Sequence, residues 1–519
     1  MTLDSAAILG RRVECEGYRG TVRFVGEIEG TGCGTWLGVD WDDVSRGKHD
    51  GSHKEKRYFT TRYPTSGSFV RPHKVNLGRT CSTAITEQYE PLQQEKLETM
   101  QREAVFKANR AQVKVFEFVG FDEAWEKTSQ HENLSTIDLR CQQISGGDSS
   151  LSQLCPNLVE LDVRQNLLSS WEDVASITKH LPKLRTLNIS QNRMTSESDI
   201  DTLLPAFVHI QHLIAGQMEL DSNDLLLVAK LFPNLLSFQL VGNNITTLDS
   251  SLCHLLPKLQ DFDLANNPLE NWDEVFKLVR MNSLETLHLQ NTGISEINFD
   301  SILDPFPSLK TLFISGNKIN DWISVSYLER LTKLEELSFR NNPVLNLENF
   351  ETNRQIVICR INHLKILDKI IITEVERRGA SLDYLKKFGT LYLNCVNDPV
   401  KLEEFQKLHP CYQRLVDKYG APEAAELVAG STKLKNLLVN LSVSCPQTGS
   451  KMQKKVPRTM KIQKLRGMLQ KQFCAGMGNR LTILYKSQEK PNIHYEFDND
   501  LKDLAFYSIQ EGDEIIVSW

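Results

Sequence analysis

Leucines and other apolar residues recur in a fixed pattern along the middle of the chain. From about residue 134 to residue 345 the sequence repeats L-x-x-L-x-L-x-x-N-x-L, as in LRTLNISQNRM at 184–194 and LKTLFISGNKI at 309–319. Alternating apolar positions predict a short strand, and the following Asn can satisfy backbone groups at a sharp turn. The Asn position falls at 142, 166, 192, 218, 243, 267, 292, 317 and 342, with Gln142, Met218 and Thr292 in the weaker copies. Steps of 24 to 26 residues over nine copies predict a stacked array of repeats.

These copies resemble the leucine-rich repeat family, and the resemblance implies an α/β solenoid in which stacked neighbours share one core. Trp171, Trp272 and Trp322 recur five residues after the Asn position and are expected in that core. Apolar residues then continue at helical spacing, and Ser169 and Glu172 are expected to cap the first of these helices. Each repeat is therefore predicted to place a strand on one side and a helical segment on the other.

The strand positions that point away from the core predict a candidate partner surface on the inner face of the solenoid. Its outward residues include Glu160, Asp162, Arg164 and Gln290, and the candidate contact residues are Val241, Asp261, Asp263, His288, Phe313 and Arg340. Val241 and Phe313 are apolar on a row that faces water, which favours contact with a partner protein. Single apolar residues are also common on protein surfaces, so a solvated face is the alternative.

Residues 1–80 show a different pattern, in which glycines and aromatic residues separate short β-like runs. WLGVDWDDVSRGKHDGS at 36–52 and GSFVRP at 67–72 predict a small, strongly turned β domain. Gly47 and Lys48 suggest a phosphate loop, but that motif requires G-x-x-x-x-G-K-[ST]. Asp42 occupies the position of the first Gly and His49 that of the hydroxyl residue, so a nucleotide site is disfavoured.

This segment instead resembles the CAP-Gly domain family, whose signature appears here as GKHDG, preceded by WLGV and followed by YF and FV. Two positions depart from the family pattern, because His49 replaces the usual Asn and Glu55 stands where Gly is common. The resemblance implies binding of acidic, aromatic-ending C-terminal tails, as found on tubulin and a few microtubule-associated proteins. The implied site residues are Trp36, Gly47, Lys48, His49, Asp50, Gly51 and Phe59. Trp36 and Phe59 either form the slot for the terminal aromatic residue or belong to the domain core.

The charges around this signature suit such a ligand. Between residues 46 and 62 there are six Lys or Arg but only two acids, Asp50 and Glu55. A local basic excess attracts a carboxylate-rich peptide, and Lys48 can contact side-chain or terminal carboxylates directly. Glycines on either side let backbone N–H groups approach the ligand.

The rest of the chain divides by periodicity and charge. The predicted parts are a charged helical connector at 81–130, the repeats at 131–345, a cap over their open end at 346–390, a helical linker at 391–432 and a further domain at 433–519. The last part has a strand, strand, helix, strand, strand order and resembles the ubiquitin-like β-grasp fold. The predicted fold class is therefore multidomain α+β.

A basic run lies inside the last domain. Residues 451–471 carry eight Lys or Arg and no acid. Such a run is typical of a solvated face, but an acidic protein partner would also bind it.

Composition narrows the function classes. The 519 residues carry a net charge of -6, so no global basic excess indicates nucleic acid, and no apolar stretch approaches a membrane span. The N-terminus lacks the pattern of a secretory signal, and the eleven cysteines occur without a C-x-x-C pair, which favours a reduced, cytoplasmic protein. No catalytic constellation, metal-spaced cluster or cofactor motif stands out, so an enzyme is not expected.

The order of these three domains over the whole length resembles the tubulin-folding cofactor E family. That resemblance implies a cytoskeleton-associated, non-enzymatic chaperone of α-tubulin, which acts with cofactors C and D in heterodimer assembly and with cofactor B in dimer dissociation. Two alternatives stay open. One is a microtubule-associated CAP-Gly adaptor, although no long heptad run is present. The other is an adaptor of the ubiquitin pathway, with the proteasome as a partner of the last domain.

Overall fold

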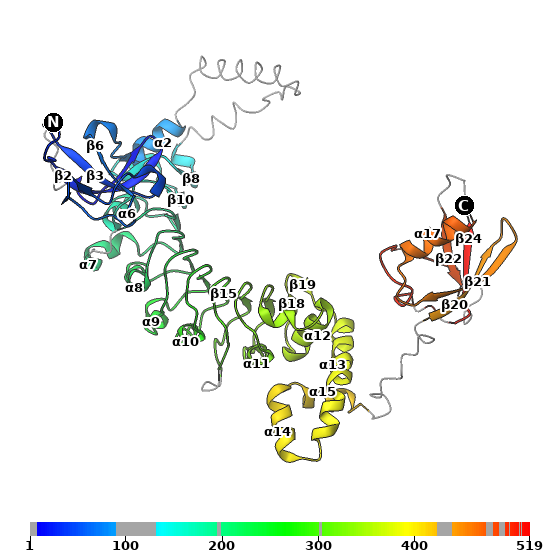
Figure 1. The fold of residues 1–519 in the computed structure, drawn as a ribbon. Helices are drawn as coiled ribbons and strands as arrows, with labels where there is room; N and C mark the ends of the chain where they lie inside the picture. The colour runs from blue at the N-terminus through cyan, green and yellow to red at the C-terminus, as the bar shows by residue number, and fades with distance from the viewer. Residues whose placement is uncertain are drawn as a thin grey trace. The chain divides into compact units, whose positions relative to one another are not determined.

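The computed structural model describes residues 8–89, 131–194, 199–299, 304–422, 438–473, 481–486, 494–497, 499–507, 509 and 511–518. The chain divides into two compact units, Met1–Ala421 and Pro422–Trp519. The first unit contains a small β domain and a long repeat array, and the second contains a mixed α+β domain (Figure 1). The predicted multidomain α+β fold class is confirmed. None of the helices in the described ranges is long and apolar enough to cross a membrane.

The small β domain is built on an antiparallel sheet in the order β1-β2-β3-β6. Its strands are β1 (Arg12–Cys15), β2 (Tyr18–Gly26), β3 (Trp36–Trp41) and β6 (Gly67–Val70), with a short hairpin of β4 (Ser52–His53) and β5 (Lys56–Arg57) and the 3-10 helices η1 (Val44–Arg46) and η2 (Pro72–Lys74). Val13, Val22, Leu37, Val39 and Trp41 are fully buried between these elements. Alternate β-branched and aromatic residues thus face one core, as the β-like runs predict.

The segment after the small domain belongs to the repeat array. β7 (Arg79–Thr80) pairs in parallel with β9 (Ile144–Gly146), and α2 (Cys81–Tyr89) places Ala84 and Ile85 in the core of the repeats. An open end of a solenoid needs such a cover, because its first repeat would otherwise expose apolar residues. The start of the expected connector is therefore a cap in this structure. The part of that prediction beyond Tyr89 lies outside the described residues.

The repeats form an 11-stranded sheet that is parallel up to its last hairpin. Its strands are β8 (Thr136–Asp138), β10 (Glu160–Asp162), β11 (Thr186–Asn188), β12 (His212–Ile214), β13 (Ser237–Gln239), β14 (Asp261–Asp263), β15 (Thr286–His288), β16 (Thr311–Phe313), β17 (Glu336–Ser338), β18 (Ile366–Leu367) and β19 (Ile370–Ile371). The other side carries α5 (Leu151–Leu154), α6 (Trp171–Thr178), α7 (Ile200–Leu203), α8 (Ser222–Leu231), α9 (Leu252–Leu255), α10 (Trp272–Phe276) and α11 (Trp322–Tyr327) (Figure 1). Strand and helix therefore occupy opposite sides of each repeat, as the periodicity predicts.

The repeated Asn residues form a buried ladder. Asn166, Asn192, Asn243, Asn267, Asn317 and Asn342 are each less than 5% exposed. The Asn267 amide donates to the carbonyls of Leu240 at 2.9 Å and Leu264 at 3.0 Å and accepts from the Ile245 N–H at 3.2 Å. Each ladder residue thus satisfies backbone groups of its own repeat and of the previous one, which is the role predicted for it.

Helix α6 begins one residue later than expected. Ser170, not Ser169, is the N-cap of α6, and its side chain accepts from the Asp173 N–H at 3.2 Å. The Asp173 carboxylate in turn accepts from the Ser169 N–H at 2.9 Å. The expected pair of Ser169 and Glu172 is wrong by one position, because the extended backbone of Ser170 (φ -150) aims its hydroxyl into the first turn. Trp171 and Trp272 are buried, whereas Trp322 is only half-buried.

Helices close the far end of the array. They are α12 (Phe350–Arg360), α13 (Glu374–Cys395), α14 (Pro399–Leu408) and α15 (Tyr412–Tyr419). α13 runs past the boundary expected at 390, and Phe405, Tyr412 and Leu415 join the core cluster of the repeats. The stretch expected as a linker therefore packs as part of the cap up to α15, because its apolar residues recur on one helical face.

The second unit has the predicted β-grasp elements and, after the helix, one short strand more than the predicted order contains, β23. Its elements are β20 (Leu438–Cys445), β21 (Ser450–Pro457), α17 (Ile462–Phe473), β22 (Thr482–Lys486), β23 (Tyr495–Glu496) and β24 (Glu514–Ser518). The sheet order is β21-β20-β24-β22-β23, with β20 and β24 parallel at the centre. Val439, Leu441 and Val443 of β20 pack with Leu465 and Leu469 of α17, which matches the alternating and helical patterns of the sequence.

Candidate functional site

The loop formed by residues 47–51 lies tightly against the segment 58–67. A Cβ atom at Gly47 would lie 2.0 Å from the Thr65 carbonyl oxygen, and one at Gly51 would lie 2.0 Å from that of Phe59. Gly51 also has a φ of +91, in the left-handed region that favours glycine. The backbone N–H groups of Lys48 and His49 donate to the Gly67 carbonyl at 2.7 and 3.1 Å. The two glycines of the motif therefore permit this packing.

An aromatic cluster stands behind the loop. It consists of Phe24, His49, Tyr58, Phe59 and Phe69. Phe69 is its centre, with ring centroids 4.7 Å from His49, 5.4 Å from Phe59 and 5.7 Å from Tyr58. Phe59 is 6% exposed, whereas Phe69 is half-buried. The cluster thus combines a buried base with partly exposed rings.

Trp36 occupies a separate position. It lies two residues from Gly38 on β3, and Gly38 is the point where the Phe59 ring packs on the strand. Within the described residues, the ring contacts of Phe59 are to His49 and Phe69 and not to Trp36. The Arg71 guanidinium lies 3.9 Å from the Trp36 ring centroid, so Arg71 and not Phe59 covers this ring.

His49 orders the loop by a hydrogen bond. Its Nδ1 atom accepts from the Gly51 N–H at 3.0 Å, which requires an unprotonated Nδ1. Burial lowers the pKa of His49, Asp50 raises it, and His53 and Lys48 lower it further. The neutral imidazole therefore takes the acceptor role that the side-chain oxygen of an Asn can play two residues before an N–H.

Most of the basic residues near the loop are already paired. The ion pairs are Arg46 with Glu16 at 2.8 Å, Lys56 with Glu29 at 2.5 Å, Arg57 with Asp50 at 2.6 Å and Arg62 with Asp40 at 3.1 Å. Lys48 and Lys54 are exposed and form no ion pair with another described residue. The basic excess counted along the sequence is thus reduced locally to these two side chains, because acidic residues of the small β domain neutralise the rest.

Both carboxylate oxygens of Asp50 accept hydrogen bonds within the domain. Its Oδ1 accepts from the Ser52 N–H at 3.1 Å and its Oδ2 from Arg57 at 2.6 Å. Hydrogen bonds from Ser52 lower the pKa of Asp50, so the carboxylate stays ionised and keeps its hydrogen bonds to Ser52 and Arg57. Among the seven predicted residues, Lys48 is the one with an exposed charged group that lacks an ion pair in the described part of the chain.

Sequence reasoning left four contributors out of the candidate set. These are Phe24, Tyr58, Phe69 and Arg71. Tyr58 and Phe69 occur in the aromatic motifs that follow the loop, but their packing against each other depends on how the chain folds. Arg71 gives no signal in the sequence, since it reaches Gly34 at 2.9 Å from 37 residues away.

The second candidate surface is partly contiguous. Asp263, His288 and Phe313 are aligned across β14, β15 and β16. The rings of His288 and Phe313 stack at 4.5 Å, and His288 Nε2 lies 3.3 Å from Asp261 Oδ1. Burial raises the pKa of Asp263. Burial would also raise that of Asp261, but hydrogen bonds with His288 and Ser237 lower it overall. We call Asp261, Asp263, His288 and Phe313 the sheet face.

The remaining predicted contact residues lie apart from the sheet face. Val241 is half-buried just after β13, and Arg340 is exposed just after β17. Arg340 donates to the Asp368 carbonyl at 2.8 Å, which ties it to the cap. The structure therefore groups four of the six candidates and separates two. Across the described ranges, no group of His, Cys, Asp and Glu side chains is arranged to hold a metal ion.

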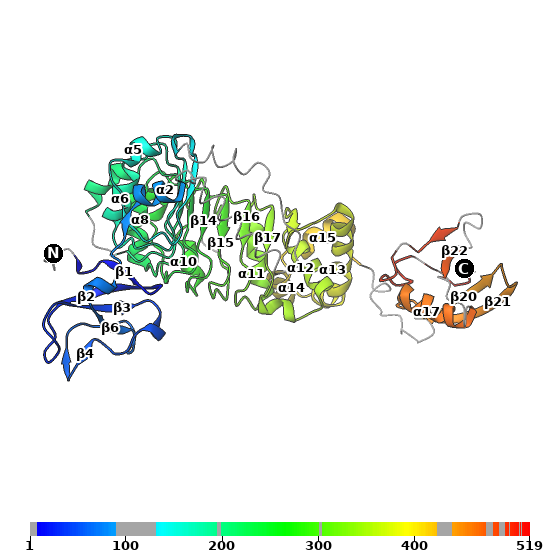
Figure 2. The same ribbon diagram turned by 90° about the horizontal axis from the view of Figure 1, so that it is seen from above.

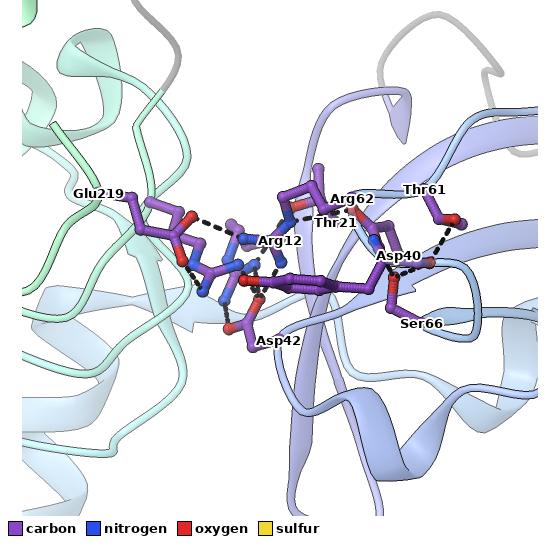
Figure 3. Close-up of polar contacts among 10 residues, drawn as sticks. Arg12, Thr21, Asp40, Asp42, Thr61, Arg62, Ser66 and Glu219 are labelled. Atoms are coloured by element: carbon purple, nitrogen blue, oxygen red, sulfur yellow. Dashed lines mark hydrogen bonds and ion pairs between the residues drawn. The ribbon is translucent and has the colours of Figure 1, made fainter. Parts of the chain in front are cut away.

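A charged network joins the small β domain to the solenoid (Figure 3). Arg62 donates to Glu219 at 2.7 Å and pairs with Asp40 at 3.1 Å. Asp42 accepts from Arg12 at 2.7 Å and forms an ion pair with Arg193 at 3.0 Å. Arginine and carboxylate therefore alternate across the contact, and both sides supply each charge.

Further contacts hold the same interface. Glu14 accepts from Gln143 at 2.6 Å, and Arg11 pairs with Asp173 at 3.3 Å. Figure 2 shows the N-terminal sheet beside the first repeats, consistent with these contacts. Because Arg62 follows Phe59 by three residues, the network begins next to the aromatic cluster. Sequence analysis did not predict this docking, since its partners are more than 120 residues apart.

Three domain families match the chain. Residues 9–75 match the CAP-Gly domain, residues 236–396 a leucine-rich repeat family, and residues 438–518 the ubiquitin-like domain. The solution structure of the C-terminal ubiquitin-like domain of mouse tubulin-specific chaperone e is 30% identical. It covers 18% of this chain and 93% of its own, with a TM-score of 0.15.

Full-length relatives match from end to end. Tubulin-specific chaperone E of Danio rerio is 38% identical and covers 100% of both chains. The Homo sapiens protein of the same name is 36% identical and covers 99% of both chains. Identity at this level over the whole length of both proteins establishes the family: the chain belongs to the tubulin-specific chaperone E family.

Proposed function

We propose that this protein is a tubulin-folding chaperone that captures α-tubulin at two places. The acidic C-terminal tail binds at the 47–51 loop and its aromatic cluster, and the folded body binds the sheet face of the solenoid. In this proposal the protein acts with cofactors C and D in assembling the αβ-tubulin heterodimer and with cofactor B in separating it. It works by binding and not by catalysis, in the cytoplasm and at the cytoskeleton. The names of the relatives support tubulin as the partner.

The observation that carries the tail site is the position of Lys48. Its ammonium group is exposed and lacks an ion pair in the described residues, while Arg46, Lys56 and Arg57 are neutralised. Lys54 is also exposed and forms no ion pair within the described ranges, but Lys48 is the one that stands within the loop that packs on partly exposed aromatic rings. A cation beside such rings suits a peptide that ends in carboxylates and an aromatic residue.

The docked small domain supports capture at two places. The network around Arg62 and Glu219 holds the tail site on the first repeats, so the two surfaces belong to one compact unit. When one contact forms, the second becomes intramolecular and its effective concentration rises. Weak binding at each of the two surfaces is then sufficient for tight binding of α-tubulin.

Mixing the purified protein with αβ-tubulin tests the proposal. We expect native gels to show loss of the intact heterodimer and a new complex that contains α-tubulin. Unchanged heterodimers, with binding to polymerised microtubules only, would instead indicate a microtubule adaptor.

Substitution of Lys48 tests the tail site separately. Lys48→Ala should weaken binding of an α-tubulin tail peptide by roughly 1 to 3 kcal/mol, because a charge-assisted contact is lost. Lys74→Ala is the matched control, since Lys74 is an exposed lysine in η2, beyond the far end of β6 from Gly67. Equal affinities of the two variants would remove Lys48 from the site.

A further inference from the structure

The strand β21 forms an open edge of the ubiquitin-like sheet. It pairs with β20 over all eight residues, from Ser450 opposite Cys445 to Pro457 opposite Leu438, and ends the sheet order of the described strands. An edge strand of this length presents unpaired backbone N–H and C=O groups along its free side. Another extended chain can add there by main-chain hydrogen bonds.

Basic side chains line this edge and continue past it. They are Lys451, Lys454, Lys455, Arg458, Lys461 and Lys464. In the described part of the domain none of these six forms an ion pair, whereas Arg466, further along α17, pairs with Asp500 at 2.8 Å. Lys451 and Lys455 are exposed. Side chains alternate between the two faces of a strand and Val456 is buried, so both lysines lie on the face of β21 that points away from the core. The edge therefore carries uncompensated positive charge.

The positive charge of β21 determines which kind of strand can pair with this edge. Pairing with β21 of a second copy would place lysines opposite or diagonal to lysines, which is unfavourable across strands. A strand that carries carboxylates at alternate positions would place them beside Lys451 and Lys455 instead. The same side chains thus oppose self-association and favour an acidic segment.

A hollow lies just beyond the end of the strand. It has a volume of ≈ 270 Å³ and is lined by Pro457, Thr459, Met460, Lys461, Gln463 and Lys464. Met460 is half-buried and supplies an apolar wall, while Lys461 and Lys464 supply ammonium groups. A side chain of the added strand can enter this hollow with a carboxylate next to the two lysines.

We propose that β21 is a docking edge for an extended acidic segment of a partner protein, which joins the sheet as a further strand beside Lys451, Lys455 and Lys461. The edge lies in the second compact unit, whereas the tail site and the sheet face lie in the first. This inference therefore goes beyond the proposed function and does not depend on it.

The test uses the full chain and a fluorescein-labelled octapeptide of alternating Glu and Val with an amidated C-terminus. All proteins carry Lys48→Ala, so that the tail site contributes as little as possible to binding. Fluorescence anisotropy should show saturable binding that weakens with salt, and Lys451→Glu with Lys455→Glu should lower the affinity about tenfold or more. The matched control is Lys386→Glu with Lys471→Glu, which makes the same charge change at exposed positions on α13 and α17 and should change the affinity by less than about twofold.

A second probe separates strand addition from attraction of charge. The same peptide with alternate backbone amides N-methylated keeps every carboxylate but cannot pair along one edge, and it should bind about tenfold more weakly. Equal binding of the two peptides would overturn the docking edge. Equal loss of affinity in the control variant, or displacement of the probe by polyuridine RNA or phosphatidylserine vesicles at lower concentrations than unlabelled peptide, would overturn it as well.

Discussion

The Asn ladder of the solenoid and the 47–51 loop of the CAP-Gly domain are both short polar motifs at sharp turns, yet they serve different purposes. In the ladder one residue type recurs, is buried, and uses its amide for backbone groups, as Asn267 does with Leu240 and Leu264. The loop motif occurs once along the chain, its residues have different neighbours, and Lys48 remains exposed. Polar residues repeated at a structural period therefore support the fold, and a solitary motif with an exposed charge is the better candidate for binding.

Substitution in the ladder should have the largest effect on stability. Asn267→Ala leaves the buried Leu264 carbonyl and the Ile245 N–H without their partner and leaves the Leu240 carbonyl with one amide donor instead of two. We therefore expect the free energy of unfolding of the array to fall by about 4 kcal/mol. Urea unfolding followed by circular dichroism measures this change. Asn267→Thr is the control, because Thr292 fills the same position with a bond to the Leu289 carbonyl at 3.0 Å and should cost less. A loss below about 1 kcal/mol for the Ala variant would contradict the structural role of the ladder.

Substitution of a loop glycine should affect stability less and binding more. Gly51→Ala combines a left-handed backbone with a contact of 2.0 Å to the Phe59 carbonyl, so the loop must move at a cost of about 3 kcal/mol. We expect tail-peptide affinity to fall at least about tenfold, measured by fluorescence anisotropy. Gly32→Ala is the matched control, since its added Cβ would lie 3.9 Å from Arg71 and its φ is not in the left-handed region. A tail affinity unchanged in Gly51→Ala would separate this loop from the tail site.

Substitutions between the domains should have a moderate effect. A double-mutant cycle of Arg62→Ala and Glu219→Ala should give a coupling of about 1 kcal/mol, because the two side chains are 27% and 43% exposed. We expect faster hydrogen exchange in the small β domain and weaker capture of whole tubulin, with tail-peptide affinity unchanged. Lys310→Ala with Glu285→Ala is the control, an exposed pair at 2.8 Å within the solenoid. If the peptide and whole tubulin lose affinity equally, the docking does not act by holding two surfaces together.

Acid should have the smallest effect. Burial lowers the pKa of His49 below its ordinary 6.5, so the unfolded chain binds more protons in that range. The stabilisation by neutral His49 is therefore present above pH 6.5 and is lost as the pH falls through the lower folded-state value. Urea unfolding of the small β domain measures this effect. From about pH 7.5 to about pH 5.5 the free energy of unfolding should fall more in the wild type than in His49→Asn, and the difference should be less than about 1 kcal/mol because the ring is half-exposed. Parallel pH profiles would show that the Gly51 N–H does not depend on a neutral ring.

Much of the architecture could be predicted because its signals are local and periodic. A step of 24 to 26 residues determines the repeats, and alternating residues determine the strands of the terminal domains. The loop at Gly47 and Gly51 is also local, since both glycines are needed for one close packing. Helix starts were less certain, as the shift from Ser169 to Ser170 shows, because neighbouring hydroxyls compete for the same cap.

The sequence by itself therefore determined the number, order and type of the domains, and it indicated the residues of the proposed tail site. Only the tertiary structure decided that Arg46, Lys56 and Arg57 are neutralised while Lys48 is not, and that Arg62 reaches Glu219 in the solenoid. It also decided that α2 and α15 cover the two ends of the array. The physical reason is distance along the chain. Periodic burial can be recognised from neighbouring residues, whereas an ion pair between distant residues forms only after the chain has folded and packed.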